Sequence, residues 1–201
     1  DLILDGEDLK LTSIAIDGEP LQSSNYAINP ETLTIFAPPS TPFTLQTEVE
    51  INPAKNTRLE GLYLSDGIYC TQCEAEGFRR ITYFLDRPDV MTTYDVEIRG
   101  DATALPTLLS NGDLVDEGQL DDGRHFARWR DPWNKPCYLF ALVAGNLGRL
   151  SDTFTTKSGK TVDLHIWTDP GQDHKAAYAM DALKRSFAWD ERVYALEYDL
   201  G

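Results

Sequence analysis

Basic residues are scarce in this sequence. It contains 18 lysines and arginines against 33 aspartates and glutamates, which gives a formal net charge of −15 at pH 7. Nucleic-acid binding depends on cationic side chains that neutralise phosphates, so this excess of acids argues against a nucleic-acid partner. An acidic surface keeps a protein in solution, and we expect a cytoplasmic protein on this ground.

Long hydrophobic runs are missing as well. The longest run, from Tyr138 to Gly145, falls far short of the about 20 residues that a membrane-spanning helix needs. The chain begins at Asp1 without the basic segment and apolar stretch of a secretory leader. It also has no initiating methionine, which predicts an internal piece of a longer protein. We therefore expect no membrane partner.

Cysteine is rare, with three in 201 residues: Cys70, Cys73 and Cys137. An odd number argues against a disulfide framework. The Cys70-x-x-Cys73 spacing invites a zinc or redox interpretation, but no second pair of cysteines or histidines lies at ligand spacing. A redox pair would also need a helix start in a βαβ unit, which the sequence does not indicate. We expect reduced thiols packed along a strand.

Helical periodicity is absent before about residue 173. Alternating apolar and polar residues predict antiparallel strands instead, for example over Phe43–Ile51. Asp17-Gly18 between two such runs predicts a tight hairpin. Asp131–Pro136 is rich in turn-forming residues and predicts a loop, and the apolar run Tyr138–Val143 predicts a buried strand. The predicted fold class is mostly β.

The pattern changes after Gly145. Thr153–Lys157 and Thr161–Trp167 predict one more hairpin, and Asp173 to Arg192 predicts a helix with Asp173 as its N-cap. Apolar residues at spacings of four, three and four would form one stripe on this helix. These residues are Ala176, Met180, Leu183 and Phe187.

The sequence contains no arrangement of metal ligands. A His-Glu-x-x-His segment, which places two histidines one helical turn apart, is missing. The three histidines are His125, His165 and His174, and no two of them have that spacing. We expect none of them to bind a metal, and we assign no catalytic residue.

The densest functional signal is the stretch from Tyr69 to Arg80. Gln72 and Glu74 are two residues apart, so in an extended segment they point to the same side. A carboxylate only accepts hydrogen bonds, and the amide oxygen of a glutamine adds another acceptor. An ammonium group offers three donors and a positive charge. The pair is therefore suited to bind the free amino terminus of a peptide.

The same stretch resembles the N-terminal domain of the aminopeptidase N family, zinc metallopeptidases that remove residues from peptide N-termini. The resemblance rests on Thr71-Gln72-x-Glu74-Ala75, two following arginines, an aromatic residue and Asp86-x-Pro88. It is closer to the bacterial branch and extends over nearly the whole chain, including Leu109–Gly112, Lys135–Gly145 and Asp152–Thr156. Many relatives have Asp-Glu-Pro where this chain has Asp86-Arg87-Pro88.

The resemblance implies a division into two parts. Residues 1–146 would form an antiparallel, saddle-like β-sandwich domain. Residues 147–201 would form a hairpin and a helix that begin an α+β, thermolysin-like catalytic domain, here truncated. Zinc would belong to the full-length enzyme and none to this fragment, whose partners would be peptide substrates with a free N-terminus and the rest of its own catalytic domain.

The resemblance also implies roles for single residues. The acid that matches Glu74 binds the α-amino group of the substrate, and the residue that matches Gln72 lines the pocket for the first side chain. A cis peptide bond is expected between Glu74 and Ala75. The fragment alone would be inert, because the zinc ligands and the general base are missing.

Two alternatives stand beside this interpretation. From spacing alone, Glu74 could cap the following turn or pair with Arg79 or Arg80, which we otherwise expect to be structural ion-pair partners. At the level of the whole chain, the alternative is a stand-alone β-sandwich binding or interaction module with no enzyme attached.

Overall fold

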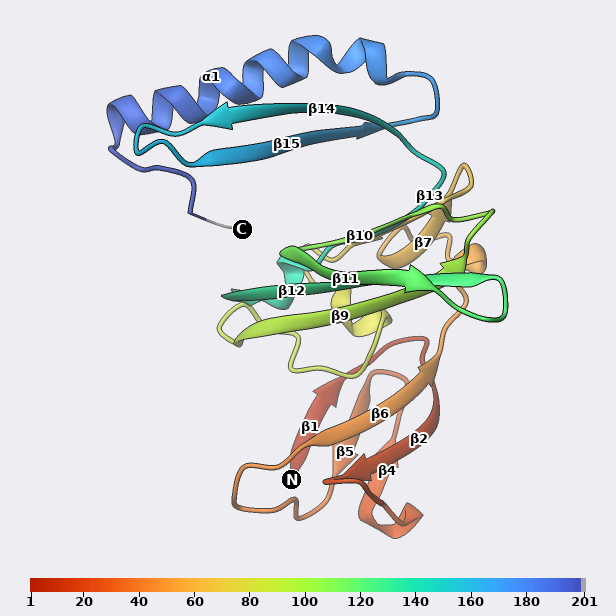
Figure 1. Ribbon diagram of the computed structural model, residues 1–201. Helices are drawn as coiled ribbons and strands as arrows, with labels where there is room; N and C mark the ends of the chain where they lie inside the picture. Colours follow the sequence, from red (N-terminus) through yellow and green to blue (C-terminus); the bar gives the residue numbers. More distant parts are fainter. Residues whose placement is uncertain (200–201) are drawn as a thin grey trace.

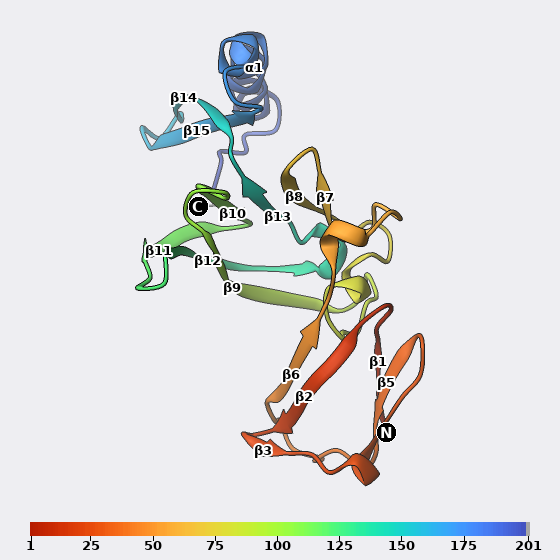
Figure 2. The same cartoon turned by 90° about the vertical axis from the view of Figure 1, so that its right-hand side faces the viewer.

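The computed structural model describes residues 1–199. Its elements stack in three tiers that follow the order of the chain (Figures 1 and 2). The N-terminal tier covers residues 1–50, the middle tier 61–145 and the C-terminal tier 148–199. The predicted mostly β class is confirmed: the sheets are antiparallel, and the α-helix of the described residues lies near the C-terminal end.

The N-terminal tier packs two three-stranded sheets against each other. Its strands are β1 (Leu2–Asp5), β2 (Lys10–Ile16), β3 (Glu19–Pro20), β4 (Tyr26–Ile28), β5 (Thr32–Ile35) and β6 (Leu45–Glu50). One sheet has the order β1-β5-β4 and the other β3-β2-β6. The core between them contains Leu4, Ile14, Leu33 and Ile35, together with Tyr83 from a later loop.

Local sequence patterns account for this tier well. Side chains of β6 alternate between half-buried and exposed along the strand, as the alternation over Phe43–Ile51 predicts. The Asp17-Gly18 hairpin is also confirmed, because Ile16 pairs with Glu19 across the turn. Asp17 and Gly18 have φ values of 51° and 86°, the left-handed pair that a two-residue hairpin turn requires.

The middle tier joins a four-stranded and a three-stranded sheet. Its strands are β7 (Gly61–Ser65), β8 (Ile68–Gln72), β9 (Met91–Asp101), β10 (Thr107–Ser110), β11 (Asp113–Gln119), β12 (Arg124–Pro136) and β13 (Leu142–Gly145). The sheets have the orders β10-β13-β8-β7 and β11-β12-β9. Ile98 and Ala127 of one sheet pack on Leu108 and Ala144 of the other, so burial of apolar surface holds the two sheets together.

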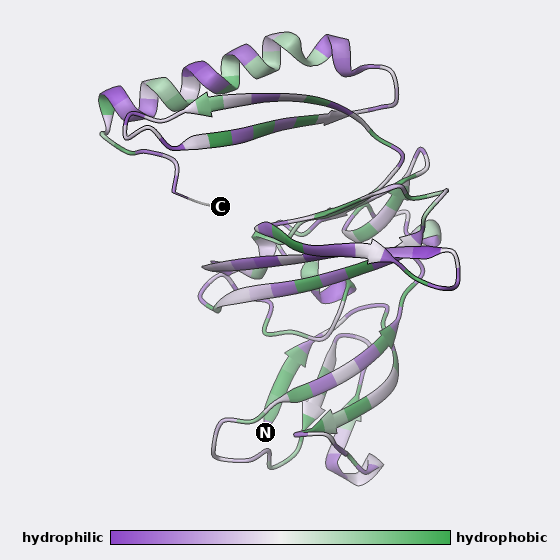
Figure 3. Ribbon diagram, in the orientation of Figure 1, coloured by the Kyte–Doolittle hydropathy of each residue, from purple (hydrophilic) through white to green (hydrophobic). Residues whose placement is uncertain are grey.

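The C-terminal tier is a hairpin covered by the helix. Strands β14 (Gly148–Thr155) and β15 (Thr161–Thr168) pair along their whole length, and α1 spans Ala177–Val193. The predicted helical stripe is confirmed for three of its four residues, since Met180 packs on Val162 and Leu164, with Leu183 and Phe187 beside them. The fourth, Ala176, lies just before α1. Hydrophobic and hydrophilic residues follow one another along α1 (Figure 3), as expected for a helix with one buried face.

Short 3₁₀-helices connect several strands. They are η1 (Ser23–Asn25), η2 (Pro53–Lys55), η3 (Phe78–Arg80), η4 (Cys137–Leu139) and η5 (Asp173–Ala176). The prediction that Asp173 caps the long helix is wrong, because Asp173 begins η5 and Ala176 occupies the N-cap position of α1. The predicted helix region therefore opens with one tighter turn.

Two predictions around Pro136 are wrong. The region Asp131–Pro136 is not a separate loop: β12 continues through it, with its pairing to β9 interrupted between Asp131 and Lys135. The run Tyr138–Val143 is not one strand either, since η4 occupies its start and β13 begins only at Leu142. Asn111 is the reason, because its side chain bonds the backbone of Leu139 and Ala141, at 3.1 and 2.6 Å, in place of a strand partner.

Candidate functional site

The candidate site lies on the loop that follows β8. This strand ends at Gln72, and a hydrogen bond from the Gly77 amide to the Cys73 carbonyl closes a turn at 2.8 Å. Cys73 and Gly77 are buried, whereas the residues between them, Glu74 to Glu76, are exposed. The loop therefore has a buried base and an exposed tip.

The base of the loop depends on two glycines. A Cβ atom on Gly77 would lie 2.4 Å from the Gln72 carbonyl oxygen and 2.9 Å from the Gly61 amide nitrogen. Gly61 has a φ of 71°, and a Cβ there would lie 2.7 Å from the Cβ of Arg80. Such distances leave no room for a side chain. The loop thus packs backbone to backbone against the start of β7.

Ion pairs of two largely buried arginines hold the residues after the tip. Arg79 donates from Nε to Asp86 at 2.9 Å, and Arg80 donates to Glu7, Asp8 and Glu60. The side chain of Arg80 is only 7% exposed. The prediction that both arginines are structural ion-pair partners is confirmed.

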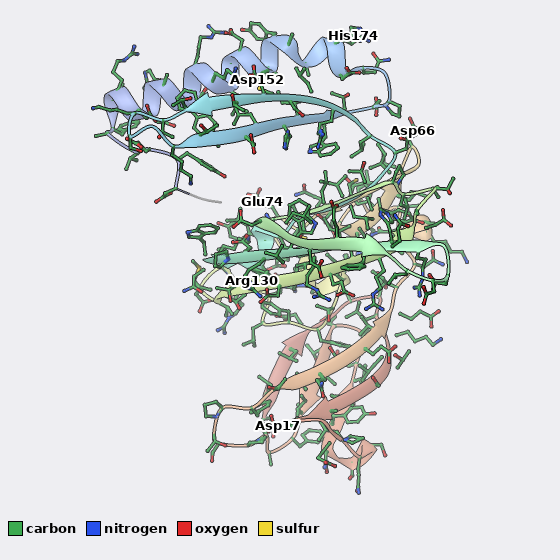
Figure 4. The ribbon with its side chains drawn as sticks, viewed as in Figure 1. Asp17, Asp66, Glu74, Arg130, Asp152 and His174 are labelled. Carbon is green, nitrogen blue, oxygen red and sulfur yellow. The ribbon has the colours of Figure 1, made fainter. Side chains whose placement is uncertain are left out.

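The carboxylate of Glu74 is exposed and has no hydrogen-bond or ion-pair partner among residues 1–199. The alternative that it pairs with Arg79 or Arg80 is contradicted, because Arg79 bonds Asp86 and Arg80 bonds the acids named above. Figure 4 shows Glu74 in the upper part of the middle tier. The peptide bond between Glu74 and Ala75 is cis, as expected.

Gln72 is exposed beside Glu74, and its amide is oriented by the loop itself. Its Nε2 donates to the Glu74 carbonyl oxygen at 3.0 Å. A carbonyl oxygen can only accept, so the Nε2 atom must face it and Oε1 is the end left open. The two residues that the sequence singled out are thus linked by a hydrogen bond from Gln72 to the Glu74 backbone. They do not share an extended segment as expected, because Gln72 ends β8 and Glu74 lies in the turn that follows.

Charge at the tip is negative. Glu76 lies two residues beyond Glu74, with a side chain 70% exposed, and its carboxylate is 3.6 Å from Arg79. Arg79 is already engaged with Asp86 and is largely covered, at 16% side-chain exposure. The loop can therefore attract a cation and offers it acceptors only.

The cysteines are structural. All three are free, and Cys73 and Cys137 are buried in one apolar cluster with Phe78 and Phe140. Burial raises the pKa of both the Cys73 and the Cys137 thiol to about 12, so both stay protonated at neutral pH. The expectation of packed, reduced thiols is confirmed for these two, but neither lies in a strand: Cys73 follows the end of β8, and Cys137 opens η4.

The three histidines are scattered over the fold. His125 lies in β12, where its Nε2 is 2.6 Å from the Leu105 carbonyl oxygen, and His165 lies in β15 beside Ser151. His174 lies in η5. Within residues 1–199, no group of three or more histidines, cysteines or acids is placed to hold a metal ion.

A groove of about 1120 Å³ runs between the middle and the C-terminal tier. Trp129 and Trp133 line it from β12, and His165 and Trp167 line it from β15. Neither Gln72 nor Glu74 belongs to its lining, so the groove and the acidic loop are separate features. Within residues 1–199, every helix is too short or too polar to span a bilayer.

Fold and loop together define a mostly antiparallel β protein with an acidic, acceptor-only surface loop. Comparison with protein families matches residues 1–139 to the Peptidase M1 N-terminal domain. The chain belongs to this family, which confirms the resemblance seen in the sequence.

Comparisons with individual proteins give the same result. Over 99% of its length, the chain is 58% identical to aminopeptidase N from Caulobacter vibrioides, and it covers 23% of that protein. A crystal structure of Legionella pneumophila aminopeptidase A in complex with aspartic acid is 39% identical, with a TM-score of 0.95, 99% of this chain covered and 23% of that one.

A more distant structure shares the fold alone. It is an M1 zinc metallopeptidase from Deinococcus radiodurans bound to a Tyr-Ser-Ala substrate, 16% identical, with a TM-score of 0.69 and covering 85% of this chain and 40% of that chain.

Sequence reasoning missed the supports of the site. In the sequence, Asp86 stands out only as part of the family motif and Cys137 only as one of three cysteines. In the structure, Cys137 donates a hydrogen bond to Asp86 at 2.9 Å beneath the loop. Asn111 was not singled out by itself. The signal that could have found Asp86 is an acid directly after the apolar run Tyr83-Phe84-Leu85, because a buried carboxylate needs a partner.

Proposed function

We propose that this chain is the N-terminal part of a zinc aminopeptidase, in which Glu74 binds the free α-ammonium group of a peptide. The observation that carries the proposal is the exposed, unpartnered carboxylate of Glu74 beside the open amide oxygen of Gln72. Membership of the Peptidase M1 N-terminal domain family supports it. The alternative of a stand-alone binding module has no specific observation in its favour.

The proposed contact has a reasonable strength. An ammonium and a carboxylate about 4 Å apart attract by roughly 4 kcal/mol at an effective dielectric constant near 20. Desolvation and loss of side-chain freedom reduce this to a net gain of about 1.5–3 kcal/mol for a charged hydrogen bond. A peptide with a free N-terminal amine would therefore bind more tightly than one with a blocked amine. The same contact would place the peptide bond to be cleaved one residue from the N-terminus.

Gln72 would complete the contact and line the pocket for the first side chain. Its Oε1 is an acceptor for a second ammonium hydrogen, while its bond to the Glu74 carbonyl oxygen keeps that end turned outward. Two acceptors, two residues apart in the chain, match the three donors of an ammonium better than one. Neutral donors would gain less, because they lack the charge.

Zinc in the proposed enzyme does not fit the residues of this chain. The sequence lacks a His-Glu-x-x-His segment, and the described residues form no ligand group. We therefore assign this chain binding and orientation of the substrate, and the metal to residues beyond it. The chain spans only 23% of its Caulobacter vibrioides relative.

The proposal includes a division of the chain and a location. We assign residues 1–146 to the N-terminal β domain and residues 147–201 to the start of the catalytic domain, the change of architecture at β14 being the support. The location we propose is the cytoplasm, which agrees with the acidic composition and with three unpaired cysteines.

The test is Glu74→Gln in the zinc-loaded, full-length enzyme. This change keeps size and removes the charge, so kcat/KM for aminoacyl anilides should fall by about 10- to 100-fold, as expected for losing 1.5–3 kcal/mol. Glu76→Gln is the matched control, an exposed acid on the same loop, and should change kcat/KM by less than about twofold. Equal kinetics for wild type and Glu74→Gln would refute the proposal.

A further inference from the structure

The loop that presents Glu74 is fastened to one buried carboxylate, that of Asp86. Its side chain is only 1% exposed. One oxygen, Oδ2, accepts hydrogen bonds from the backbone nitrogen and from Nε of Arg79, at 3.1 and 2.9 Å. The Asp86 carbonyl oxygen accepts a further bond from Nη2 of Arg79 at 3.2 Å. Asp86 therefore fixes both the backbone and the side chain of Arg79.

The other oxygen of Asp86 reaches a different part of the chain. Oδ1 accepts a hydrogen bond from Sγ of Cys137 at 2.9 Å. Cys137 opens η4, and Ala141 follows a few residues later. Next along the chain, Leu142 donates its backbone nitrogen to Oγ1 of Thr71, the residue before Gln72, at 2.9 Å, and Val143 pairs with Cys70 of β8. Asp86 thus also ties down the segment that borders Gln72.

A third connection leads to the N-terminal tier. The backbone nitrogen of Asp86 donates to Oδ2 of Asp5 at 3.0 Å, and Glu7 donates its backbone nitrogen to the Arg79 carbonyl oxygen at 3.0 Å. The buried Asp86 thus bonds Arg79, seven residues away, and two segments distant in sequence, at Asp5 and Cys137. None of these bonds uses the exposed tip of the loop.

We infer that Asp86 is a positioning residue, which acts through Arg79 and Cys137 to hold Glu74 and Gln72 in the geometry that binds the substrate amine. The inference rests on the function proposed above. Two features support it: Asp86 bonds the residue that follows the loop, and it bonds the segment that borders Gln72. Asp86 itself would not touch the substrate.

Two features make the interactions of Asp86 specific: the positive charge of Arg79 and the hydrogen-bond donor of Cys137. Arg79 is the one cation that pairs with Asp86 in the described part of the chain, and a buried carboxylate that lost it would be left without compensation. The Cys137 thiol stays protonated because burial raises its pKa to about 12, so it acts as a donor over the working pH range. Asparagine at position 86 would keep the shape but lose the charge that holds Arg79.

The experiment is a double-mutant cycle in the zinc-loaded, full-length enzyme with Asp86→Asn and Glu74→Gln. Asp86→Asn should raise KM for aminoacyl anilides by about tenfold with kcat changed less than about twofold, since a misplaced anchor weakens amine binding. It should weaken an amino-acid inhibitor by the same factor and leave its des-amino analogue unchanged. In the Glu74→Gln background, Asp86→Asn should raise KM by a clearly smaller factor, because only the Gln72 contact remains to be misplaced.

A structural role alone gives a different result. Asp131→Asn is the matched control, because Asp131 is also buried and pairs with Lys135, away from the loop. It should lower the melting temperature without changing the preference for the amino acid over its des-amino analogue. If Asp86→Asn also lowers only the melting temperature, or if its effect on KM adds in full to that of Glu74→Gln, the inference is overturned.

A second pair of variants serves if Asp86→Asn does not fold. Cys137→Ser keeps a hydrogen-bond donor and should bind the amino-acid inhibitor as wild type does. Cys137→Ala removes the donor and should weaken that inhibitor by about threefold, a fraction of the effect expected for a charged partner. Equal inhibitor binding by both variants would contradict the inference. If Glu74→Gln itself has no effect on KM, the proposed function fails first, and the two failures remain distinguishable.

Discussion

Two adjacent arginines beneath the candidate site bind different acidic residues. Arg79 turns toward Asp86, whereas Arg80 turns toward Glu7, Asp8 and Glu60. A guanidinium group offers five donors in a fixed plane, so one Arg80 can serve three acids from two distant segments. A lysine has a single charged nitrogen and could not span them. The loop is thereby held to both the N-terminal tier and its own continuation.

The buried thiols give a prediction about alkaline pH. Burial, and next the charge of Asp86, raises the pKa of Cys73 to about 12, and burial with the Asp86 hydrogen bond does the same for Cys137. Above about pH 9 the unfolded chain releases these protons while the folded chain keeps them. The stabilisation is complete below pH 9 and is lost as pH rises toward 12, by about 1.4 kcal/mol per pH unit for each thiol.

Urea unfolding of the chain between pH 8 and pH 11 measures this. The free energy of unfolding should fall more steeply with pH in wild type than in Cys73→Ala, which has one buried thiol fewer. Parallel curves for the two proteins would show that Cys73 does not titrate differently in the folded and unfolded states.

At the scale of elements, helix α1 depends on one side of its surface. Met180 is 4% exposed and packs on β15, whereas Tyr178, two residues earlier, is 77% exposed. Met180→Ala should lower the free energy of unfolding by about 2–5 kcal/mol, the cost of removing a buried side chain of this size. Tyr178→Ala should change it by less than about 0.5 kcal/mol, as surface substitutions usually do.

Urea denaturation followed by circular dichroism of the helix compares the two variants. Similar midpoints for Met180→Ala and wild type would mean that the hairpin does not support the helix through this face.

A helix, strand or turn was predictable where neighbouring residues determine its conformation, but not where a residue distant in the sequence does. The alternation in β6 and the left-handed turn at Asp17 follow from neighbours in the chain. The break before β13 does not, because it depends on Asn111, about 30 residues away. Likewise β12 extends to Pro136 because β9 resumes pairing there, which overrides the turn-forming composition of that stretch.

The same distinction applies to the site. Gln72 and Glu74 were found from spacing and family motif, and the structure exposes both on one loop. Their support by Asp86 could not be derived, since the bond from Cys137 joins residues 51 apart in the sequence. The direction in which Glu74 points depends on Arg79 and Arg80 being engaged elsewhere. Spacing alone left that question open.

At the scale of the whole molecule, the chain carries the proposed substrate anchor, but residues 1–199 form no group that could hold a metal ion. Peptide hydrolysis by a zinc enzyme requires an activated water on the metal, with three protein ligands and one open position. In this structure His125 belongs to the middle tier, and His165 and His174 lie on β15 and η5 of the C-terminal tier. The three histidines could bind one ion together only if the packing of the middle and C-terminal tiers were lost.

We therefore predict that the purified 201-residue chain does not hydrolyse an aminoacyl anilide, with or without added zinc, although it retains Glu74. Released aniline is measured by absorbance, with the full-length enzyme as the positive control. Circular dichroism of the same sample shows that the sheets are formed, which separates lack of chemistry from lack of folding. Zinc-dependent release of aniline by the folded chain would contradict the prediction, because it would require a metal site formed by residues that this fold keeps apart.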